Sequence, residues 1–413
     1  MASPLLATAS GPFGATAGHL DRSSERIATD DLNAATTVPV RLIILGYDED
    51  LWRERVDTVS KKLPWVALDS MLLNASPAGA RHLLRLARDH ANLDVIAGVP
   101  GTTLANLVRE GLVRSLGTWI RRLDLLPTMQ LLATYDQSLV ALPLSGYPVF
   151  AVFNPRAFDA AGITEPGETY DDWLDTARRL TDHERYAYGW GVVADTPEIE
   201  TIVRSSGSTF ASGATVTPSS AWQWYADLVH IEGISPPPFA WDGLVGTHAA
   251  LKEGLIAMTM RSAWILDELS SHEPPKSRFW QLAPLPCWSH KDRVVPVRAD
   301  YAAVTSNSLV ADIASTVAAT LATDAWFTPR ARGVPAWRPA LEQVATSHHL
   351  QTHELTESSD NWHRPSLETP EAELTQSLLL PAIDDVMASG EPVRQRMQDL
   401  ARDLLLLSSG GVV

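Results

Sequence analysis

The stretch SLVALPLSGYPVFAVFNPRAF, residues 138–158, contains two apolar runs on either side of the short turn SGYP. Short continuous apolar runs bounded by turn residues are typical of buried β-strands. The stretch therefore predicts two strands joined by a tight link. What these strands connect depends on the sequence before and after them.

Before this stretch, apolar strand patterns alternate with amphipathic helix patterns. The strands are expected at 38–46, 65–73 and 93–99, with helices at 49–63 and 78–90 between them. Such alternation predicts an α/β fold with a parallel sheet covered by helices on both faces. Ligands of these sheets bind beyond the carboxyl ends of the strands, which directs attention to Tyr47, Asp48, Asp50 and the turn VPGTT (99–103). The two aspartates could equally cap the helix that follows.

After this stretch, two segments carry clear boundary signals. In GETYDDWLDTARRLTD (167–182), Thr169 is positioned to cap a helix and Asp172 follows three residues later. In LKEGLIAMTMRSAW (251–264), Gly254 predicts the end of a helix, and LIAMTM after it predicts a strand. That strand leads directly to Arg261 and Trp264.

Composition limits the classes of function. At 413 residues the chain is too long for one ordinary core, which predicts two lobes. The net charge of −16 argues against binding to nucleic acid. The single cysteine, Cys287, excludes an intramolecular disulfide and is expected to be a buried, inert thiol. No apolar run is long enough to span a membrane, and residues 1–37 have the composition of a flexible arm without a signal peptide or a lipid-bearing cysteine.

Motifs of catalysis are missing from the sequence. There is no nucleotide-binding glycine motif, no GxSxG elbow and no calcium loop. His349 and His353 have metal-ligand spacing, but no third ligand is evident. We therefore expect no catalytic residue, no cofactor and no metal.

Four motifs in order resemble one known family. They are LDVIAGVPGTTLANLVREGLVRSL (93–116), the long stretch 135–181 around SGYP, LKEGLIAMTMRSAW (251–264) and WQLAPLP (280–286). They resemble the extracellular solute-binding proteins of ABC importers, family 1, in the maltose-binding-protein-like cluster. The resemblance covers nearly everything from Val38 to about Gly390.

The resemblance implies a two-lobe periplasmic-binding-protein-like fold of type II. Each lobe would be a mostly parallel sheet flanked by helices, with a ligand cleft between the lobes. The first lobe would comprise 38–146 and 283–325, and the second 147–282 and 326–413. The chain would cross between them near Tyr147, Leu285 and Ala325.

The resemblance also implies a set of ligand-binding residues. The strand LIAMTM would bring its end to the cleft, where Trp264 would stack on the ligand and Arg261 could meet an anion. The alternatives are that Trp264 packs inside the second lobe and that Arg261 forms a surface ion pair. The remaining candidates are Tyr147, where maltose-binding protein presents a carboxylate, Tyr47 and Asp48 after the first strand, the turn ADTPEIE (194–200), Asp300 and Tyr301 near the hinge, and Trp241 on a loop.

The function implied is the binding of a sugar, or of a sugar-like or aromatic solute, with hinge closure. The protein would be extracytoplasmic and would deliver its ligand to an ABC permease. The chain departs from sugar-binding relatives at Gly101 and Thr102, where they carry Asp and Arg. The alternative is a cytoplasmic protein that keeps this fold and uses the cleft as a biosynthetic enzyme or a sensor.

Overall fold

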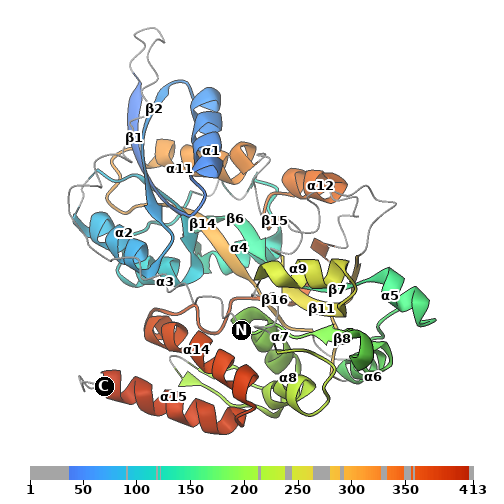
Figure 1. Cartoon of the computed structure of the whole chain (residues 1–413). Helices are drawn as coiled ribbons and strands as arrows, with labels where there is room; N and C mark the ends of the chain where they lie inside the picture. The colour runs from blue at the N-terminus through green and yellow to red at the C-terminus, as the bar shows by residue number, and fades with distance from the viewer. Residues whose placement is uncertain are drawn as a thin grey trace, which may run out of the picture.

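The computed structural model describes residues 37–89, 92–117, 120, 122–212, 215–237, 244–263, 280–288, 293–326, 333–347, 355–356 and 359–408. Two candidate ligand contacts, Trp241 and Trp264, lie outside these residues, as do nearly all of the expected N-terminal arm and both His349 and His353. Figure 1 shows the described elements arranged around two separate sheets.

The larger sheet is built mainly from the first part of the chain. Its strands are β1 (Val38–Gly46), β2 (Val66–Asn74), β3 (Val95–Pro100), β6 (Ala141–Tyr147), β14 (Arg298–Val304) and β15 (Val334–Pro335), in the spatial order β15-β6-β14-β3-β1-β2. β1 pairs in parallel with β2 and β3, whereas β14 runs antiparallel to β3 and β6. Residues 42–46 of β1 and 95–99 of β3 are continuously buried, as a parallel sheet covered on both faces requires.

Several helices flank this sheet, and they include the helices expected from the alternating pattern. α1 (Glu49–Lys62) packs beside α11 (Ala311–Ala322), and α2 (Pro77–Asp89) packs beside α3 (Gly101–Arg109). The predicted β-α-β-α-β order of residues 38–100 is therefore confirmed.

The second sheet begins directly after the SGYP turn. It consists of β7 (Val149–Phe153), β8 (Tyr188–Gly191), β11 (Ile256–Ser262) and β12 (Gln281–Ala283), in the order β12-β7-β11-β8. The helices that contact it are α6 (Tyr170–Leu180), α7 (Thr196–Ser205) and α9 (Leu244–Lys252), while α8 (Ser220–His230) packs on α7. Aromatic side chains fill the core of this lobe through ring contacts among Tyr170, Trp173, Trp190, Trp224 and Trp288.

Two boundary predictions in this lobe are confirmed at atomic detail. Thr169 accepts a hydrogen bond from the backbone N–H of Asp172, whose carboxylate accepts one from the N–H of Thr169, so the two form a capping box at the start of α6. Gly254 has φ of 73° just after α9, a conformation that only glycine adopts without strain, and it lets the chain turn into β11.

Three connections join the lobes. Pro148 alone separates β6 of one sheet from β7 of the other, so the SGYP link is the first crossing. The second lies between β12 and β14 and contains β13 (Val295–Pro296). The third contains β16 (Trp362–His363), which pairs in parallel with β13, so two of the connections run side by side.

The third crossing does not lie near Ala325, where the sequence predicted it. Ala325 is buried in a 3-10 turn against α1 and α11, and β15 after it pairs with β6 in the larger sheet. α12 (Arg338–Ser347) packs on β15. We therefore propose that residues 326–347 belong to the first lobe and that the chain leaves it only through β16.

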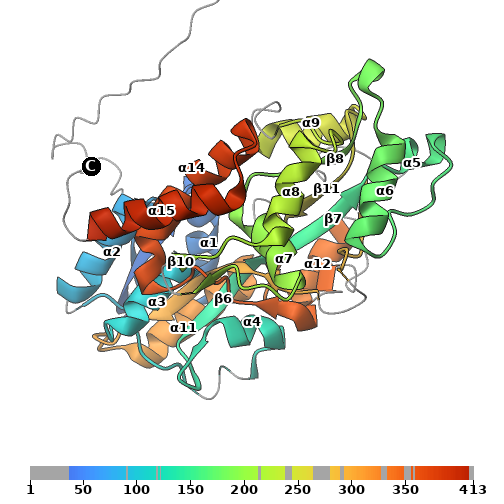
Figure 2. The same cartoon turned by 90° about the horizontal axis from the view of Figure 1, so that it is seen from below.

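The last two helices lie along the second lobe. α14 (Glu373–Ser389) and α15 (Val393–Ser408) run side by side and contact α8, as Figure 2 shows from below. The remaining described elements are α4 (Pro127–Leu132), α5 (Pro155–Ala160), β4 (Thr134–Tyr135), β5 (Ser138–Leu139), β9 (Ala211–Ser212), β10 (Thr215–Val216) and four 3-10 turns (His183–Arg185, Asp324–Trp326, Ser359–Asn361 and Pro370–Ala372).

Candidate functional site

The first polar cluster lies where β6 leaves the larger sheet. The hydroxyl of Tyr147, the last residue of β6, donates a hydrogen bond of 2.8 Å to Asp300 Oδ2 on β14. Arg55 from α1 is buried beside them and carries the compensating positive charge. Burial raises the pKa of Asp300 to about 6, and both Tyr147 and Arg55 act in the opposite direction. Two predicted site residues, Tyr147 and Asp300, therefore meet.

A second cluster lies in the other lobe, at the start of α7 and on β11. The backbone N–H of Ser262 donates to Glu198 Oε1 over 2.8 Å, which holds the carboxyl against the strand that carries Arg261. Burial raises the pKa of Glu198 to about 7; the nearby Asp195 adds to the rise, and the positive charge of Arg261 opposes it. Arg261 is only 3% exposed, so the alternative of a surface ion pair is wrong.

Both members of this second cluster have unused hydrogen-bonding atoms. Glu198 Oε2, Arg261 Nε and Arg261 Nη2 are buried and have no hydrogen-bond partner in the described part of the protein. Buried polar atoms without partners cost free energy and are rare in folded proteins. Their presence on two neighbouring elements makes this place the candidate site for a polar ligand.

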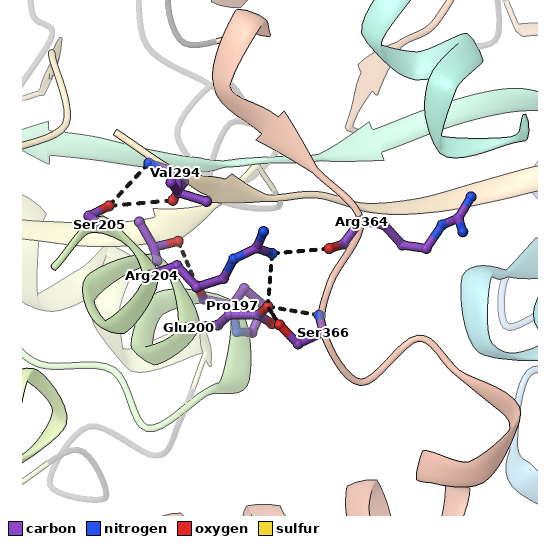
Figure 3. Close-up of polar contacts among 8 residues, drawn as sticks. Pro197, Glu200, Arg204, Ser205, Val294, Arg364 and Ser366 are labelled. Atoms are coloured by element: carbon purple, nitrogen blue, oxygen red, sulfur yellow. Dashed lines mark hydrogen bonds and ion pairs between the residues drawn. The ribbon is translucent and has the colours of Figure 1, made fainter. Parts of the chain in front are cut away.

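The third connection ties the second lobe to the first through a polar cluster that Figure 3 shows. Glu200 Oε1 on α7 accepts hydrogen bonds from the N–H and the hydroxyl of Ser366, at 2.8 and 2.6 Å. Arg204, one turn later, bonds to Glu200 and to the carbonyl of Arg364. Arg364 extends in the opposite direction: it donates to the carbonyls of Leu132 and Thr134.

Arg298 interacts with charged residues of two of these clusters. Arg298, the first residue of β14, forms an ion pair of 3.7 Å with Asp195, the N-cap residue of α7. Arg298 also acts on Glu368, a buried residue of the third connection, whose carboxyl lies against Gly101 at the start of α3. Charged residues of both lobes and of the third connection therefore lie close enough to interact.

Other predicted site residues lie elsewhere or have structural roles. Tyr47 is 77% exposed, and the Asp48 carboxylate caps α1 by accepting from the N–H of Leu51. Asp50 pairs with Arg53 on the same helix. Tyr301 is 1% exposed and is part of the core around the larger sheet. The contacts therefore support the capping interpretation for Asp48, whereas Asp50 lies in the first turn of α1 and pairs with Arg53.

Sequence reasoning missed several members of the site. It marked the turn 194–200, which contains Glu198 and Glu200, but it singled out neither side chain. No local sequence pattern singles out the other charged residues, which are Arg55, Arg298, Arg364 and Glu368. The only available hint was the acidic pair of PEIETIV (197–203), which interrupts an apolar helical pattern.

The described residues show neither a metal centre nor a membrane segment. No three His, Cys, Asp or Glu side chains among them are grouped so as to hold a metal ion. None of the helices described is both long and apolar enough to cross a bilayer. Cys287 is buried and unpaired, as expected.

Solved structures of solute-binding proteins share the fold of this chain. The sugar-binding protein MalE of Xanthomonas citri has a TM-score of 0.73 and 14% identity, covering 89% of this chain and 96% of that one. A sugar transporter of Rhizobium etli in an open conformation has a TM-score of 0.71 and 17% identity (89% and 99%). An ABC transporter solute-binding protein of Thermotoga lettingae, bound to α-D-tagatose, has a TM-score of 0.67 and 15% identity (89% and 99%).

These matches confirm the two-lobe fold expected from the four motifs. No curated protein sequence matches this chain significantly. The sequence profile of the bacterial extracellular solute-binding proteins matches residues 76–308, which is more than half of the 413 residues. The chain therefore belongs to the bacterial extracellular solute-binding protein family.

Proposed function

We propose that this protein binds a sugar or a sugar-like solute between its two lobes and delivers it to an ABC permease outside the cytoplasm. Membership of an extracellular solute-binding family supports the location and the partner. The structural relatives include proteins described as bound to α-D-tagatose, cycloalternan and maltose. Hinge closure would take place about the three connections.

One observation carries the proposal: Arg261 and Glu198 are buried near each other, and each has hydrogen-bonding atoms with no partner in the described part of the chain. A guanidinium and a carboxyl together offer donors and acceptors, which is what the hydroxyl groups of a sugar require. Asp195 and Arg261 both act electrostatically on Glu198. Asp195 also forms an ion pair with Arg298, which belongs to the other lobe. A solute there would satisfy atoms that have no partner among the described residues.

Trp264 completes the proposed site. It follows Arg261 by three residues in the motif that resembles the ligand-stacking segment of the family. An indole ring presents a flat apolar face to the C–H face of a sugar ring, so we assign it the stacking role. Tyr147 and Asp300 are proposed as contacts from the first lobe.

The test is titration calorimetry against a panel of neutral mono- and oligosaccharides. We expect at least one to bind, with Arg261→Gln and Trp264→Ala each weakening it by about 10-fold or more, since a hydrogen bond to a charged group or a stacked ring contributes about 1.4 kcal/mol or more. Arg178→Gln, at an exposed ion pair on α6, is the matched control and should bind normally. Failure of every sugar to bind the folded wild type would refute the proposal.

Arg261 is buried, so loss of binding in its variant needs a check of folding. The melting temperature of each variant without ligand separates a folding defect from a binding defect. Closure is tested separately by small-angle scattering, where the ligand should reduce the radius of gyration of the wild type.

A further inference from the structure

An ion pair joins the two lobes beside the candidate site. Arg298 Nη2, on β14 of the larger sheet, lies 3.7 Å from Asp195 Oδ1, at the start of α7 in the second lobe. We call this contact the interlobe ion pair. The side chain of Arg298 is 47% exposed and that of Asp195 is 29% exposed, so dissolved ions can reach both charges. The attraction therefore depends on the separation of the lobes and on the salt concentration.

Each partner of the interlobe ion pair adjoins one half of the candidate site. Arg298 is directly opposite Tyr147 in the ladder between β14 and β6, two residues before Asp300. Asp195 is the N-cap residue of α7, and Glu198 follows it by three residues. A movement that separates the lobes would therefore separate Arg298 from Asp195 next to the residues proposed to contact the solute.

Both partners are fixed by the secondary structure of their own lobe. Arg298 pairs with Tyr147 in a β-ladder, and Asp195 Oδ1 accepts a hydrogen bond of 2.7 Å from the N–H of Thr196. Each charge thus belongs to a regular element of one lobe. Loss of the attraction can therefore change the arrangement of the lobes without changing the backbone inside either lobe.

We propose that the interlobe ion pair favours the closed arrangement of the lobes, so that salt concentration regulates the affinity of the site even for an uncharged solute. This inference rests on the proposed function, because closure serves to enclose a solute. The Debye length falls from about 8 Å at 0.15 M salt to about 3 Å at 1 M, so concentrated salt screens exposed charges at this distance. An exposed ion pair changes an equilibrium by up to about 5-fold.

The first test needs no solute. Dyes are attached to cysteines introduced at Leu309 in the first lobe and Ile231 in the second, which are 86% and 73% exposed, whereas Cys287 is buried. Single-molecule energy transfer then measures the ratio of closed to open molecules, and the radius of gyration identifies the more open state. In the wild type this ratio should be about 2- to 5-fold higher than in Arg298→Gln at low salt. The difference should disappear at about 1 M sodium chloride.

Matched variants separate the interlobe ion pair from a general change of charge. Arg178→Gln removes a guanidinium with the same exposure, 47%, whose partner Glu232 is 28% exposed, but this pair lies within the second lobe and should leave the ratio unchanged. Asp195→Asn keeps a side chain able to cap α7 and should reproduce the effect of Arg298→Gln. Arg298→Lys keeps the positive charge and should restore most of the wild-type ratio. The double variant should be no more open than either single variant.

The second test is calorimetry with a neutral sugar that binds the wild type. The net charge of −16 gives all the proteins a shared response to salt, so the comparison is between variants. Raising the salt should weaken binding by about 2- to 5-fold more in the wild type and in Arg178→Gln than in Arg298→Gln or Asp195→Asn. Melting temperatures of the variants without solute check that each is folded.

The inference is overturned if the wild type and Arg298→Gln respond equally to salt, or if Arg178→Gln opens the lobes as much as Arg298→Gln does. It is also overturned if the effects of Arg298→Gln and Asp195→Asn simply add in the double variant. Absence of sugar binding would refute the proposed function. The energy-transfer measurement tests the interlobe ion pair whether or not a sugar binds.

Discussion

The hydrogen bond between Tyr147 and Asp300 allows a quantitative prediction about the junction of the lobes. The hydroxyl lies 2.8 Å from Asp300 Oδ2, and the pKa of this carboxyl is about 6 because burial outweighs the hydrogen bond and Arg55. Tyr147→Phe removes the donor without changing the shape of the ring. Loss of this hydrogen bond should therefore destabilise the protein more when Asp300 is ionised than when it is protonated.

The size of the effect follows from the two forms of Asp300. A hydrogen bond to a charged group stabilises a protein by about 1.5–3 kcal/mol, and one between neutral groups by about 0.5–1.5 kcal/mol. At pH 8 Asp300 is ionised, so we expect Tyr147→Phe to lower the free energy of unfolding by about 2 kcal/mol. At pH 4.5 the carboxyl is protonated and the loss should be about 1 kcal/mol. The difference corresponds to a further rise of about one unit in the pKa of Asp300.

The assay is urea unfolding of the wild type, Tyr147→Phe, Asp300→Asn and the double variant at both pH values. The double-mutant cycle isolates the coupling between the two side chains. Tyr186→Phe, at an exposed tyrosine, controls for the loss of a hydroxyl and should have almost no effect. A loss that is equal at the two pH values, or larger at pH 4.5, would refute the reasoning.

Three more predictions concern stability, each measured by urea unfolding. Thr169→Ala breaks the capping box with Asp172 and should cost about 1 kcal/mol; an unchanged midpoint would contradict the role of the cap. Gly254→Ala forces a side chain to φ of 73° and should cost about 1 kcal/mol, and a neutral result would show that the turn relaxes. The raised pKa values of Glu198 (about 7) and Glu368 (about 8) mean that these two groups bind protons more tightly in the folded state than in the unfolded chain. Their contribution to stability should therefore be greatest below about pH 4.5, fall as pH rises to about 8 and then level off. Glu368→Gln should flatten this fall between pH 5 and 9, and an unchanged slope would exclude Glu368 as its source.

Local chemistry in the sequence was sufficient for the elements. The alternation of strands and helices in residues 38–100, the capping box at Thr169 and the stop at Gly254 depend on side chains and backbone angles only a few residues apart. Such local interactions can be inferred from the order of residues in the sequence. The resemblance of four motifs added the two-lobe fold, because their order over most of the chain is specific to it.

The candidate site was predicted only in part, because its members come from distant segments. Tyr147 and Asp300 were expected near the hinge and do meet, but Asp48 caps a helix and Tyr301 is in the core. The sequence around Asp48 supports both capping and ligand binding, since each uses a carboxylate after a strand. Only the position of the Leu51 N–H decides between them.

What the sequence by itself determined is therefore the elements, their order and the family. Tertiary structure alone decided which distant groups meet: Glu368 lies against Gly101 at a separation of 267 in residue number, and Glu200 bonds to Ser366 at a separation of 166. The physical reason is that a buried charge is tolerated only where partners from other segments or a bound solute compensate for its lost hydration. That compensation depends on three-dimensional packing, and no spacing within the sequence encodes it.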